Sequence, residues 1–545
     1  MSVAPVPAMP DALVARIRDG VIGEGATIDG PFGPRALIYA DYVASGRGLD
    51  FVEAALRERV LPLYANTHTE TSATGRETTR LREAARTAVR RAVGAEPRHA
   101  VIFAGAGATG AADRLVRGLA PGPETVVFIG PYEHHSNDLP WRESGACIER
   151  IPLDRAGRIC RASLDAALAR HPGAALKIGA FSAASNVTGV KSDIRGIARA
   201  LHAAGAWFVC DFAAGGPYME IDMAESAPGA ADGIDAILLS PHKFIGGPGA
   251  SGVLVADRAL FRTARPGIAG GGTVSYVTET EHVFLRDIER REEAGTPDIL
   301  GNIRAGMALD LKMAVGAARI EALEQAHVAR LLDALDALPG AELLGPRDAP
   351  RFGVFALNIR AGARLLHHNF VVALLNDLFG IQARGGCSCA GPYGHALLGI
   401  GPERARAHAA QVAAGRALFR PGWVRLGVNY FQSAETVEHL ATALGFIARN
   451  GAAFLSRYTV DAASGTWRAA GERRPAPASL RALWETEAPV AAPAPAFDAC
   501  LAEAERLAAE PQGTAAPGPA LPPEAEALRW FWLPGECPEA GEAAA

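Results

Sequence analysis

A single lysine, Lys243, follows an apolar run and lies where lysine is rarely placed for packing. The run Asp235–Leu239 predicts a buried strand, and the chain then passes through Ser240–His242 and Lys243 into a glycine-rich loop. Burial at such a strand end lowers the pKa of an amine and makes it a usable nucleophile. Lys243 is therefore a candidate for Schiff-base chemistry, and an ordinary surface lysine is the alternative interpretation of the same short pattern.

Two more polar residues, Asn186 and Asp211, follow apolar runs that predict buried strands. An ionised carboxylate such as Asp211 needs a cationic partner at a buried strand end, because burying the charge alone is unfavourable. A protonated pyridine nitrogen would serve, and its protonation makes the ring an electron sink, as in pyridoxal phosphate. Asn186 could bind a ring hydroxyl of the same group. The alternatives are a helix cap for Asp211 and a simple turn for Asn186.

The glycine-rich segment FAGAGATGAADRL follows another predicted strand and opens a helix near Thr109. Glycines let the backbone approach an anion, and a helix N-terminus supplies free N–H groups and a favourable dipole. The glycine spacing also matches a dinucleotide-binding loop, but no acidic residue ends the next predicted strand, Thr125–Ile129. The pattern therefore favours a single phosphate group near Ala108 and Thr109, with a structural turn as the alternative.

A pair of histidines, His134 and His135, follows the strand predicted at Thr125–Ile129. Either ring could lie over a planar cofactor and handle protons, and an ordinary hydrogen-bonded loop histidine is the alternative. Ligands bind beyond the carboxyl ends of the strands in a parallel sheet. We therefore expect this loop close to the other polar residues that follow strands.

The loop ARGGCSCAGPYGH holds two cysteines, Cys387 and Cys389, close to Arg384. A thiolate is the nucleophilic form of cysteine, and nearby cations lower the pKa of a thiol. In a glycine-rich loop such a cysteine could attack a substrate sulfur atom and carry the sulfur away as a persulfide. Cys387 could relay sulfur, resolve an oxidised Cys389 or simply pack. A metal site completed by His395 is a further alternative, although structural zinc usually takes four protein ligands.

Two arginines, Arg384 and Arg425, are candidates for binding a substrate carboxylate. A guanidinium grips a carboxylate with two parallel hydrogen bonds, which also fixes the bond at Cα that lies perpendicular to a cofactor ring. An ordinary surface salt bridge is the alternative for Arg425.

A layered sheet must position these residues, and strand-like and helix-like segments alternate from about Ala100 to Ala256. The alternation predicts an α/β fold with a mainly parallel sheet and helices on both faces. A long helical pattern from about Gly301 to Leu338, followed by further strands and helices, predicts a smaller α+β unit. The expected organisation is an N-terminal segment at 1–35, a large domain at 36–300, a small domain at 301–455 and a tail at 456–545.

The tail is rich in alanine and proline and is expected to be partly disordered. Within it, Phe497–Glu510 predicts a helix. The aromatic residues Trp530–Trp532 are expected to dock on the body of the chain or on a partner.

The overall composition is that of an ordinary globular protein. Of 545 residues, 49% are hydrophobic and 21% charged, and the formal net charge is -5, which gives no indication of nucleic-acid binding. No apolar run approaches the ~20 residues that span a bilayer, and the N-terminus lacks the apolar core of a signal peptide. Seven scattered cysteines do not make a disulfide framework. We expect a cytoplasmic protein without membrane or nucleic-acid partners and without a bound metal.

The order of these features is more specific than any one of them. A glycine-rich anion loop, a histidine loop, a strand-end Asn, a strand-end Asp and then Ser-x-His-Lys resembles the class V aminotransferase family of fold type I pyridoxal-phosphate enzymes. The resemblance is closest to the cysteine desulfurase and selenocysteine lyase branch. It covers roughly Ala40–Asn450, including GGGT at Gly270–Thr273 and EAGTPDILG at Glu293–Gly301. It implies a mainly parallel sheet of the seven-stranded type in the large domain.

This resemblance implies pyridoxal 5'-phosphate as the cofactor and a role for each candidate residue. Lys243 would form the Schiff base, and Cys389 would be the nucleophile that takes sulfur. Arg425, together with Arg384, would anchor the carboxylate of an amino acid substrate. The other implied contacts are His134 stacked on the ring, Asp211 at the pyridine nitrogen, Asn186 at the ring hydroxyl, Ala108, Thr109, Ser240 and His242 at the phosphate, and Thr273 from the partner subunit of a homodimer.

Two departures from the family pattern leave the substrate open. Ala214 stands where the family commonly has Gln three residues after the Asp, and Pro402–Arg420 is an extra helical stretch. The expected activity is removal of sulfur or selenium from L-cysteine or L-selenocysteine, which gives alanine and an enzyme persulfide that an acceptor protein could receive. The alternatives are an aminotransferase acting on a 2-oxo acid, a sulfurase acting on a larger cofactor, and a non-catalytic scaffold that binds a sulfur carrier.

Overall fold

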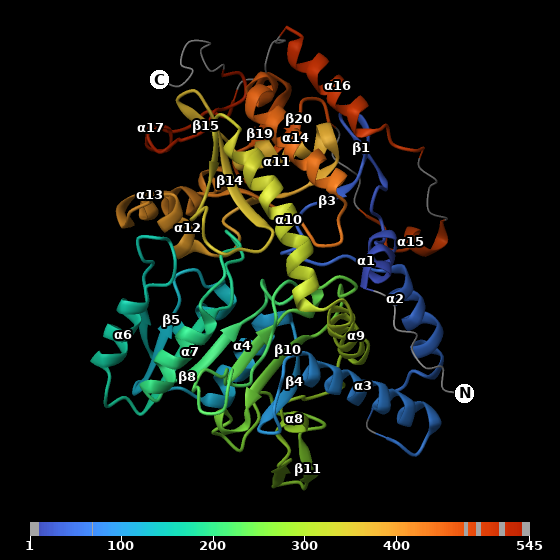
Figure 1. Cartoon of the computed structure of the whole chain (residues 1–545), viewed down its shortest axis with the longest axis vertical. Helices are drawn as coiled ribbons and strands as arrows, with labels where there is room; N and C mark the ends of the chain where they lie inside the picture. Colours follow the sequence, from blue (N-terminus) through green and yellow to red (C-terminus); the bar gives the residue numbers. More distant parts are fainter. Residues whose placement is uncertain (1–9, 68, 473–477, 487–491, 512–517, 537–545) are drawn as a thin grey trace.

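The computed structural model describes residues 10–67, 69–472, 478–486, 492–511 and 518–536. Its centre is a seven-stranded sheet in the order β4-β10-β9-β8-β7-β5-β6. Strand β10 is antiparallel to both of its neighbours, and the other pairs are parallel, so the predicted α/β fold with a mainly parallel sheet is confirmed (Figure 1). The strands are β4 (His99–Gly105), β5 (Thr125–Ile129), β6 (Cys147–Arg150), β7 (Leu176–Ser182), β8 (Trp207–Asp211), β9 (Ala236–Leu239) and β10 (Gly252–Asp257).

Six of these strands lie within about two residues of the apolar runs that predict them. Their side chains are buried on both faces of the sheet, and such strands are near-continuous apolar runs in a sequence. The sequence does not predict β6. This strand, CIER, is at the edge of the sheet and its residues are exposed or half-buried, so it has no apolar run.

Helices cover both faces of the sheet, as predicted (Figure 1). One face carries α3 (Ala73–Ala92), α6 (Arg161–Arg170), α7 (Ile194–Ala203) and α9 (Ile299–Val315), and the other carries α4 (Gly107–Leu119) and α5 (Leu139–Arg142). Alternate strand residues therefore enter two separate apolar cores, as Val127 and Phe128 of β5 do. None of the helices in the described part of the chain is long and apolar enough to cross a membrane.

A second, antiparallel sheet is built around β14 (Val354–Ala361). This strand pairs with β13 (Ala341–Leu343), β15 (Arg364–Leu366) and β18 (Trp423–Gly427), and β17 (Arg384–Gly386) pairs with β18. Its apolar core includes side chains from α10 (Ala317–Asp336), α11 (His368–Phe379) and α14 (Ala434–Asn450). The long helix predicted at the start of the small unit is in fact two helices, α9 and α10, because Gly316 with φ +89° interrupts them.

Shorter elements connect the two sheets or lie beside them. They are α1 (Pro10–Asp19), α2 (Asp50–Ala55), β1 (Thr27–Gly30) with β2 (Gly33–Ala36), β3 (Ile38–Tyr39) with β16 (Ile381–Gln382), α8 (Ile288–Arg291), α12 (Gly391–Leu397) and α13 (Pro402–Ala413). Helix α13 occupies most of the predicted extra helical stretch. The pairing of β3 with β16 holds the segment after β3 against the strand that leads to Arg384.

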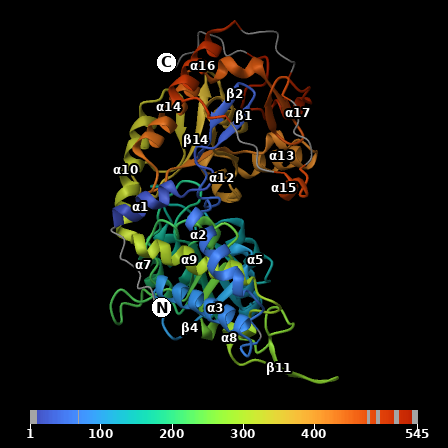
Figure 2. The same cartoon turned by 90° about the vertical axis from the view of Figure 1, so that its right-hand side faces the viewer.

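A two-stranded arm, β11 (Val274–Val277) and β12 (His282–Phe284), extends away from the body of the molecule (Figure 2). Its apolar residues Tyr276, Val277 and Val283 are 71%, 58% and 59% exposed. Thr273 lies at the base of this arm. Exposed apolar side chains gathered on one projecting element are typical of an interaction surface.

Several elements after Ser456 pack against the small sheet. Strands β19 (Tyr458–Asp461) and β20 (Thr466–Ala469) form a hairpin, α16 (Phe497–Ala509) is the predicted helix, and α17 (Pro523–Glu526) is short. Another short helix, α15 (Ala482–Glu485), has no buried residue. The aromatic segment docks on β15 of the same chain, where Leu365 N donates to Trp530 O at 3.0 Å and Trp532 N donates to Leu365 O at 3.1 Å. Parts of the expected tail lie outside the described residues, and the expected domain boundaries stay predictions.

Candidate active site

A cavity of about 230 Å³ lies where residues after β7, β8 and β9 meet the N-terminus of α4. Residues of β17, β18 and the loop after β17 line it from the small sheet. The lining contains every predicted site residue except Thr273, namely Ala108, Thr109, His134, Asn186, Asp211, Ser240, His242, Lys243, Arg384, Cys389 and Arg425. A larger, open groove of about 570 Å³ lies between residues 153–158 and 345–350, but none of the described residues that line it is a lysine, cysteine or histidine. The smaller cavity is therefore the candidate active site.

Lys243 enters this cavity from a short 3-10 turn, Pro241–Lys243, that follows β9. Burial lowers the pKa of its amine to about 8, while the carboxylate of Asp211 acts in the opposite direction. Near pH 8 a large fraction of the amine is therefore neutral, as a nucleophile or a general base requires.

Asp211 and Asn186 lie at the ends of neighbouring strands in the sheet. Asp211 is 4% exposed, and its Oδ1 accepts a hydrogen bond from Ala213 N at 2.7 Å. Burial raises the pKa of Asp211, whereas the charge of Lys243 lowers it. Asn186 donates from Nδ2 to Ser388 O at 2.8 Å, but its buried Oδ1 has no hydrogen-bond partner among the described residues. A ligand hydroxyl group would satisfy this acceptor.

His134 follows β5 and precedes a 3-10 turn, His135–Asn137. Its Nδ1 accepts a hydrogen bond from Ser136 N at 3.1 Å. Burial and the nearby charge of Lys243 lower the pKa of His134 to about 3, so the imidazole is neutral at pH 7. A neutral aromatic ring suits stacking on a flat cofactor better than pairing with an anion.

Glu133 fixes this histidine loop, and sequence reasoning does not find it. It is 3% exposed, its Oε1 accepts from Ser182 N at 2.7 Å, and its Oε2 accepts from the side chain of Asn137 at 2.7 Å. Ser182 is the last residue of β7 and pairs with Asp211 in the sheet. Glu133 therefore holds the loop of His134 against the strand ends that carry the other site residues.

One end of the cavity is formed by the first turn of α4 together with Ser240 and His242. Ser240 Oγ accepts a hydrogen bond from Ala108 N at 2.9 Å, and Thr109 also lines this end. A Cβ atom on Gly107 would lie 2.9 Å from the His242 ring and 3.0 Å from Ser240 Oγ, and the φ of Gly107 is +58°, so glycine is required here. Hydroxyl groups at the N-terminus of a helix fit a phosphate group.

The two predicted arginines lie on neighbouring strands and share one carboxylate. Arg384 and Arg425 are opposite each other in the β17–β18 pairing. Arg384 Nε donates to Asp41 Oδ2 at 2.7 Å, and Arg425 Nη2 donates to Asp41 Oδ1 at 2.6 Å. Arg425 is 3% exposed, and its Nε has no hydrogen-bond partner among the described residues. Sequence reasoning misses Asp41, although a lone acidic residue in the apolar stretch LIYADYVA is a usable signal.

Cys389 is exposed and lines the cavity at the end of a tightly held loop. Ser388 and Cys389 have φ values of +52° and +55°, which is the left-handed region of backbone conformation. A non-glycine residue in this region is destabilised by about 1–3 kcal/mol. The loop is fixed by the bond from Asn186 to Ser388 O and by His135 N, which donates to Cys389 O at 2.9 Å. The fold therefore imposes this conformation and presents the thiol to the cavity.

Cys387 and Thr273 differ from the residues above. Cys387 is half-buried and packs in an apolar cluster with Tyr393 and Trp423. The described residues contain no cluster of three or more His, Cys, Asp or Glu side chains that could hold a metal. Thr273 lies outside the cavity of its own chain, where its Oγ1 donates to Gly270 O at 2.6 Å, and its place in a partner's site stays a prediction.

A family model described as aminotransferase class V matches residues 38–440. The chain belongs to this family. The match includes all the residues that line the cavity, on the large sheet as well as the small one.

Several relatives of the chain carry the name of one activity. The chain is 30% identical over 364 residues to a probable cysteine desulfurase of Halalkalibacterium halodurans. The aligned region covers 65% of this chain and 84% of that protein. The chain is 30% identical over 377 residues to a cysteine desulfurase of Klebsiella pneumoniae, with 65% and 85% covered. The apo structure of a cysteine desulfurase from Thermococcus onnurineus superposes with a TM-score of 0.66 at 25% identity, covering 82% of this chain and 100% of that one.

Proposed function

We propose that this protein is a cysteine desulfurase that removes sulfur from L-cysteine, or selenium from L-selenocysteine, with pyridoxal 5'-phosphate as its cofactor. The observation that carries the proposal is that Cys389 lines the same cavity as Lys243 and the two arginines. An aminotransferase needs the lysine and a carboxylate anchor but no thiol nucleophile. The names of the relatives that match this chain over most of their length support the same activity.

The cavity residues fit the proposed cofactor. The unpaired Oδ1 of Asn186 matches the ring hydroxyl, and the neutral ring of His134 matches the ring face. Lys243 would hold the cofactor covalently, Asp211 would pair with the pyridine nitrogen, and the phosphate would be held by Ala108, Thr109, Ser240 and His242. When bound, the cofactor supplies an electron sink for the negative charge that develops at the substrate Cα.

The arginines and Lys243 would act on the amino acid itself. Arg425 and Arg384 would bind the substrate carboxylate and so orient the Cα–H bond toward Lys243. Lys243 Nζ would then take the Cα proton, and a positioned base of this kind contributes about 10²–10⁴ in rate. The pKa of about 8 suits this role, because the amine both accepts and releases a proton near neutral pH.

Cys389 would perform the step that defines the reaction. Its thiolate would attack the substrate sulfur and the substrate carbon–sulfur bond would break, with the electron pair of that bond staying on the substrate carbon, which takes up a proton. The sulfur would remain on Cys389 as a persulfide, and the carbon skeleton would leave as alanine. The exposed position of Cys389 supports transfer of the sulfur to an acceptor molecule outside the cavity. An acceptor protein is part of the proposal.

A homodimer is also part of the proposal. The arm β11–β12 projects from the body with exposed apolar side chains, and Thr273 lies at its base (Figure 2). A second copy that covered this arm would bury apolar surface and could receive Thr273 beside its cofactor phosphate.

Replacing Cys389 with serine tests the proposed reaction. With L-cysteine, the cofactor-loaded wild-type protein should form equal amounts of alanine and sulfide equivalents, and Cys389→Ser should lower the rate at least about 100-fold because it removes the nucleophile. Mass spectrometry should detect a persulfide on Cys389 in the wild type. Cys147→Ser is the matched control, because Cys147 is an exposed cysteine on β6, outside the cavity.

The alternative activity gives the opposite result. If Cys389→Ser kept full turnover and passed the amino group to a 2-oxo acid, the protein would be an aminotransferase. If the wild type bound neither cofactor nor amino acid, the scaffold function would replace both.

A further inference from the structure

A cavity of about 320 Å³, which we call the α13 cavity, lies on the face of the small sheet opposite the apolar core. Strands β13, β14 and β15, the end of α12, helix α13 and the docked aromatic segment contribute to its walls. None of the described residues that line it lines the active-site cavity. Sites for small organic molecules are usually mainly apolar and have volumes of about 300–1,000 Å³. The apolar part of this lining is Leu344, Leu365, Leu397, Leu398, Ile400 and Trp530.

Asn358 is a buried polar residue of the α13 cavity whose amide group is unpaired. It is 5% exposed, and its side chain makes no hydrogen bond to any residue that the structure describes. Its neighbours on β14, Leu357 and Ile359, pack in the apolar core on the other face of the sheet, so the Asn358 side chain points into the cavity. Buried polar groups in folded proteins are almost always hydrogen-bonded. The unpaired amide therefore indicates a polar group of a ligand at this position.

His408 supplies a second unpaired polar atom. It is 3% exposed, and its Nδ1 lies 3.1 Å from Phe419 O. Because a carbonyl oxygen only accepts hydrogen bonds, Nδ1 carries the proton and donates it. Burial and the charge of Arg404 lower the pKa of His408, so the ring is neutral at pH 7 and Nε2 is an acceptor. Within the described part of the chain Nε2 has no donor, and the ring meets Trp530 edge-on at 5.1 Å between centroids.

The α13 cavity has one positive charge that no carboxylate neutralises. Besides His408, its ionisable lining residues are Glu342, Arg360 and Arg404. Arg360 Nε donates to Glu342 Oε1 at 2.5 Å, so these two charges cancel. Arg404 is exposed and forms no ion pair with a described residue. The lining therefore favours a ligand with a single negative charge.

We propose that the α13 cavity is a second binding site, which takes a small organic acid with an aromatic body and one carboxylate group. The aromatic body would pack against Trp530 and the leucines of β15 and α12, since aromatic rings favour such apolar and edge-on contacts. The carboxylate would accept hydrogen bonds from the amide of Asn358 and from Arg404. Trp530 lies outside residues 38–440, so one wall of the site comes from a part of the chain that the family model does not cover.

Two probes that differ in charge test the site in the cofactor-loaded, full-length protein. 2-Naphthoate has an aromatic body and one carboxylate, and 2-naphthamide has the same rings without the charge. Isothermal titration calorimetry should give a dissociation constant below about 1 mM for 2-naphthoate, at least about fivefold lower than for 2-naphthamide. No binding of 2-naphthoate at about 1 mM, or equal affinity for the two probes, would overturn the proposal.

Replacement of Arg404 shows whether the acid binds in the α13 cavity. Arg404→Gln should weaken 2-naphthoate at least about fivefold and leave 2-naphthamide unchanged, because only the acid pairs with the guanidinium group. Arg406→Gln is the matched control, since Arg406 is also exposed on α13 but does not line the cavity. That control should leave both affinities unchanged. Equal effects of the two variants on 2-naphthoate would mean that general surface charge attracts the acid, and the proposal would be wrong.

Replacement of Asn358 separates ligand binding from folding. Asn358→Leu keeps the approximate size of the side chain and should weaken 2-naphthoate at least about tenfold, because a hydrogen bond to the carboxylate is lost. The midpoint of denaturant unfolding of the protein without probe should not fall, since the variant removes an unpaired buried amide. Unchanged affinity for 2-naphthoate in this variant would overturn the proposal, whatever the midpoint.

Discussion

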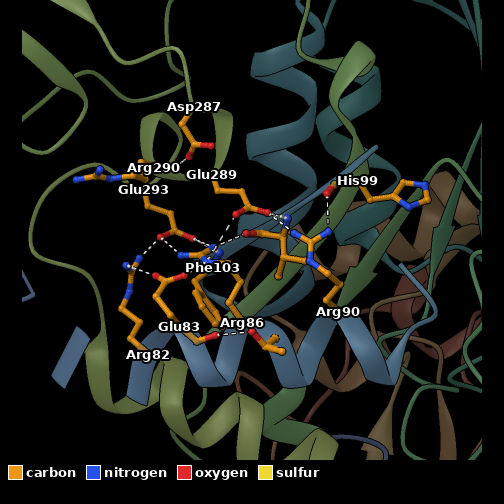
Figure 3. A network of polar contacts seen from close by, with 12 residues as sticks. Arg82, Glu83, Arg86, Arg90, His99, Phe103, Asp287, Glu289, Arg290 and Glu293 are labelled. Carbon is orange, nitrogen blue, oxygen red and sulfur yellow. Dashed lines mark hydrogen bonds and ion pairs between the residues drawn. The ribbon is translucent and has the colours of Figure 1, made fainter. Parts of the chain in front are cut away.

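The charged network between α3, β4 and α8 (Figure 3) and the cavity around Lys243 both contain arginines and carboxylates, but the carboxylates of Glu289 and Glu293 in the network are satisfied within the fold. In the network, Arg86 donates to both carboxylate oxygens of Glu293 at 2.9 and 3.0 Å, and Arg90 donates to Glu289 at 2.6 Å. The same two carboxylates accept hydrogen bonds from backbone N–H groups of β4 at 2.7 and 2.8 Å. Each of these two glutamates therefore has a guanidinium partner and a backbone donor.

The cavity differs from the network in having polar atoms that lack hydrogen-bond partners among the described residues. Its lining includes three basic residues, Lys243, Arg384 and Arg425, and two carboxylates, Asp41 and Asp211, lie beside them. Polar atoms of Asn186 and Arg425 are buried there without partners among the described residues. Carboxylates whose oxygens are paired, like those of Glu289 and Glu293, hold elements together, whereas a cluster with spare donors and acceptors is arranged for a ligand.

The largest effect on activity is expected in the cavity, from Lys243→Ala. The variant should lower the rate of alanine formation from L-cysteine by at least about 10²–10⁴, because under the proposed function it removes both the covalent link to the cofactor and the base. The variant should not lower the free energy of unfolding of the cofactor-free protein, because burial already disfavours the charged amine. Rate assays and denaturant unfolding check the two halves of this prediction, and a large loss of stability would contradict it.

The largest effect on stability is expected in the network, from Glu293→Gln. Removal of this carboxylate leaves the buried guanidinium of Arg86 without its most buried carboxylate partner, and breaking a buried pair in this way lowers the free energy of unfolding by about 3–5 kcal/mol. Glu83→Gln is the control, since the Glu83 side chain is 52% exposed and its pair with Arg86 should contribute at most about 1 kcal/mol. Denaturant unfolding of the two variants measures the difference, and equal losses would show that burial does not distinguish them.

A smaller effect is expected on the reactivity of Lys243 when Asp211 is replaced with asparagine. Burial lowers the pKa of Lys243 to about 8 against the opposing effect of Asp211, so removal of the carboxylate should lower that pKa further. In cofactor-free protein, acylation of Lys243 followed by mass spectrometry should be half-maximal near pH 8 in the wild type and at a lower pH in the variant. Asp232→Asn, which removes a buried carboxylate outside the cavity, should leave the profile unchanged.

The same lowered pKa predicts how stability depends on pH. Between the folded pKa of about 8 and the ordinary value of 10.5, the unfolded protein binds more protons at Lys243 than the folded protein does. The free energy of unfolding contributed by this residue should therefore rise as the pH increases through that window, and the rise should be absent in Lys243→Ala.

The sequence predicts the cavity better than it predicts what balances the charges in it. Lys243, Asp211 and Asn186 follow buried strands, and local patterns locate such strands because their side chains are apolar on both faces. Asp41 stands out as a lone acidic residue in an apolar stretch, but its contacts cannot be found in this way. It meets Arg384 and Arg425 across 343 and 384 residues of chain, and no local pattern encodes a contact at that separation.

The conformation of the backbone is likewise set partly by single local residues and partly by contacts between distant parts of the chain. The apolar periodicity extends from α9 into α10, so the sequence predicts one helix where Gly316 divides two. Ser388 and Cys389 adopt the left-handed conformation although glycines are close by in the loop. Hydrogen bonds from Asn186 and His135 impose that conformation, and both donors come from distant parts of the chain.

The smallest effect is expected from Cys387→Ala, which separates a packed thiol from one that faces the cavity. Cys387 packs against Tyr393 and Trp423, whereas Cys389 lines the cavity two residues later. The variant should lower the free energy of unfolding by about 1 kcal/mol and leave persulfide formation on Cys389 within about tenfold of the wild-type rate. If Cys387 relayed sulfur instead, persulfide would still form on Cys389, but the transfer of its sulfur to an added thiol acceptor would slow more than about tenfold. Separate measurements of persulfide formation on Cys389 and of sulfur transfer to the acceptor therefore decide whether Cys387 only packs in the apolar cluster or takes part in the reaction.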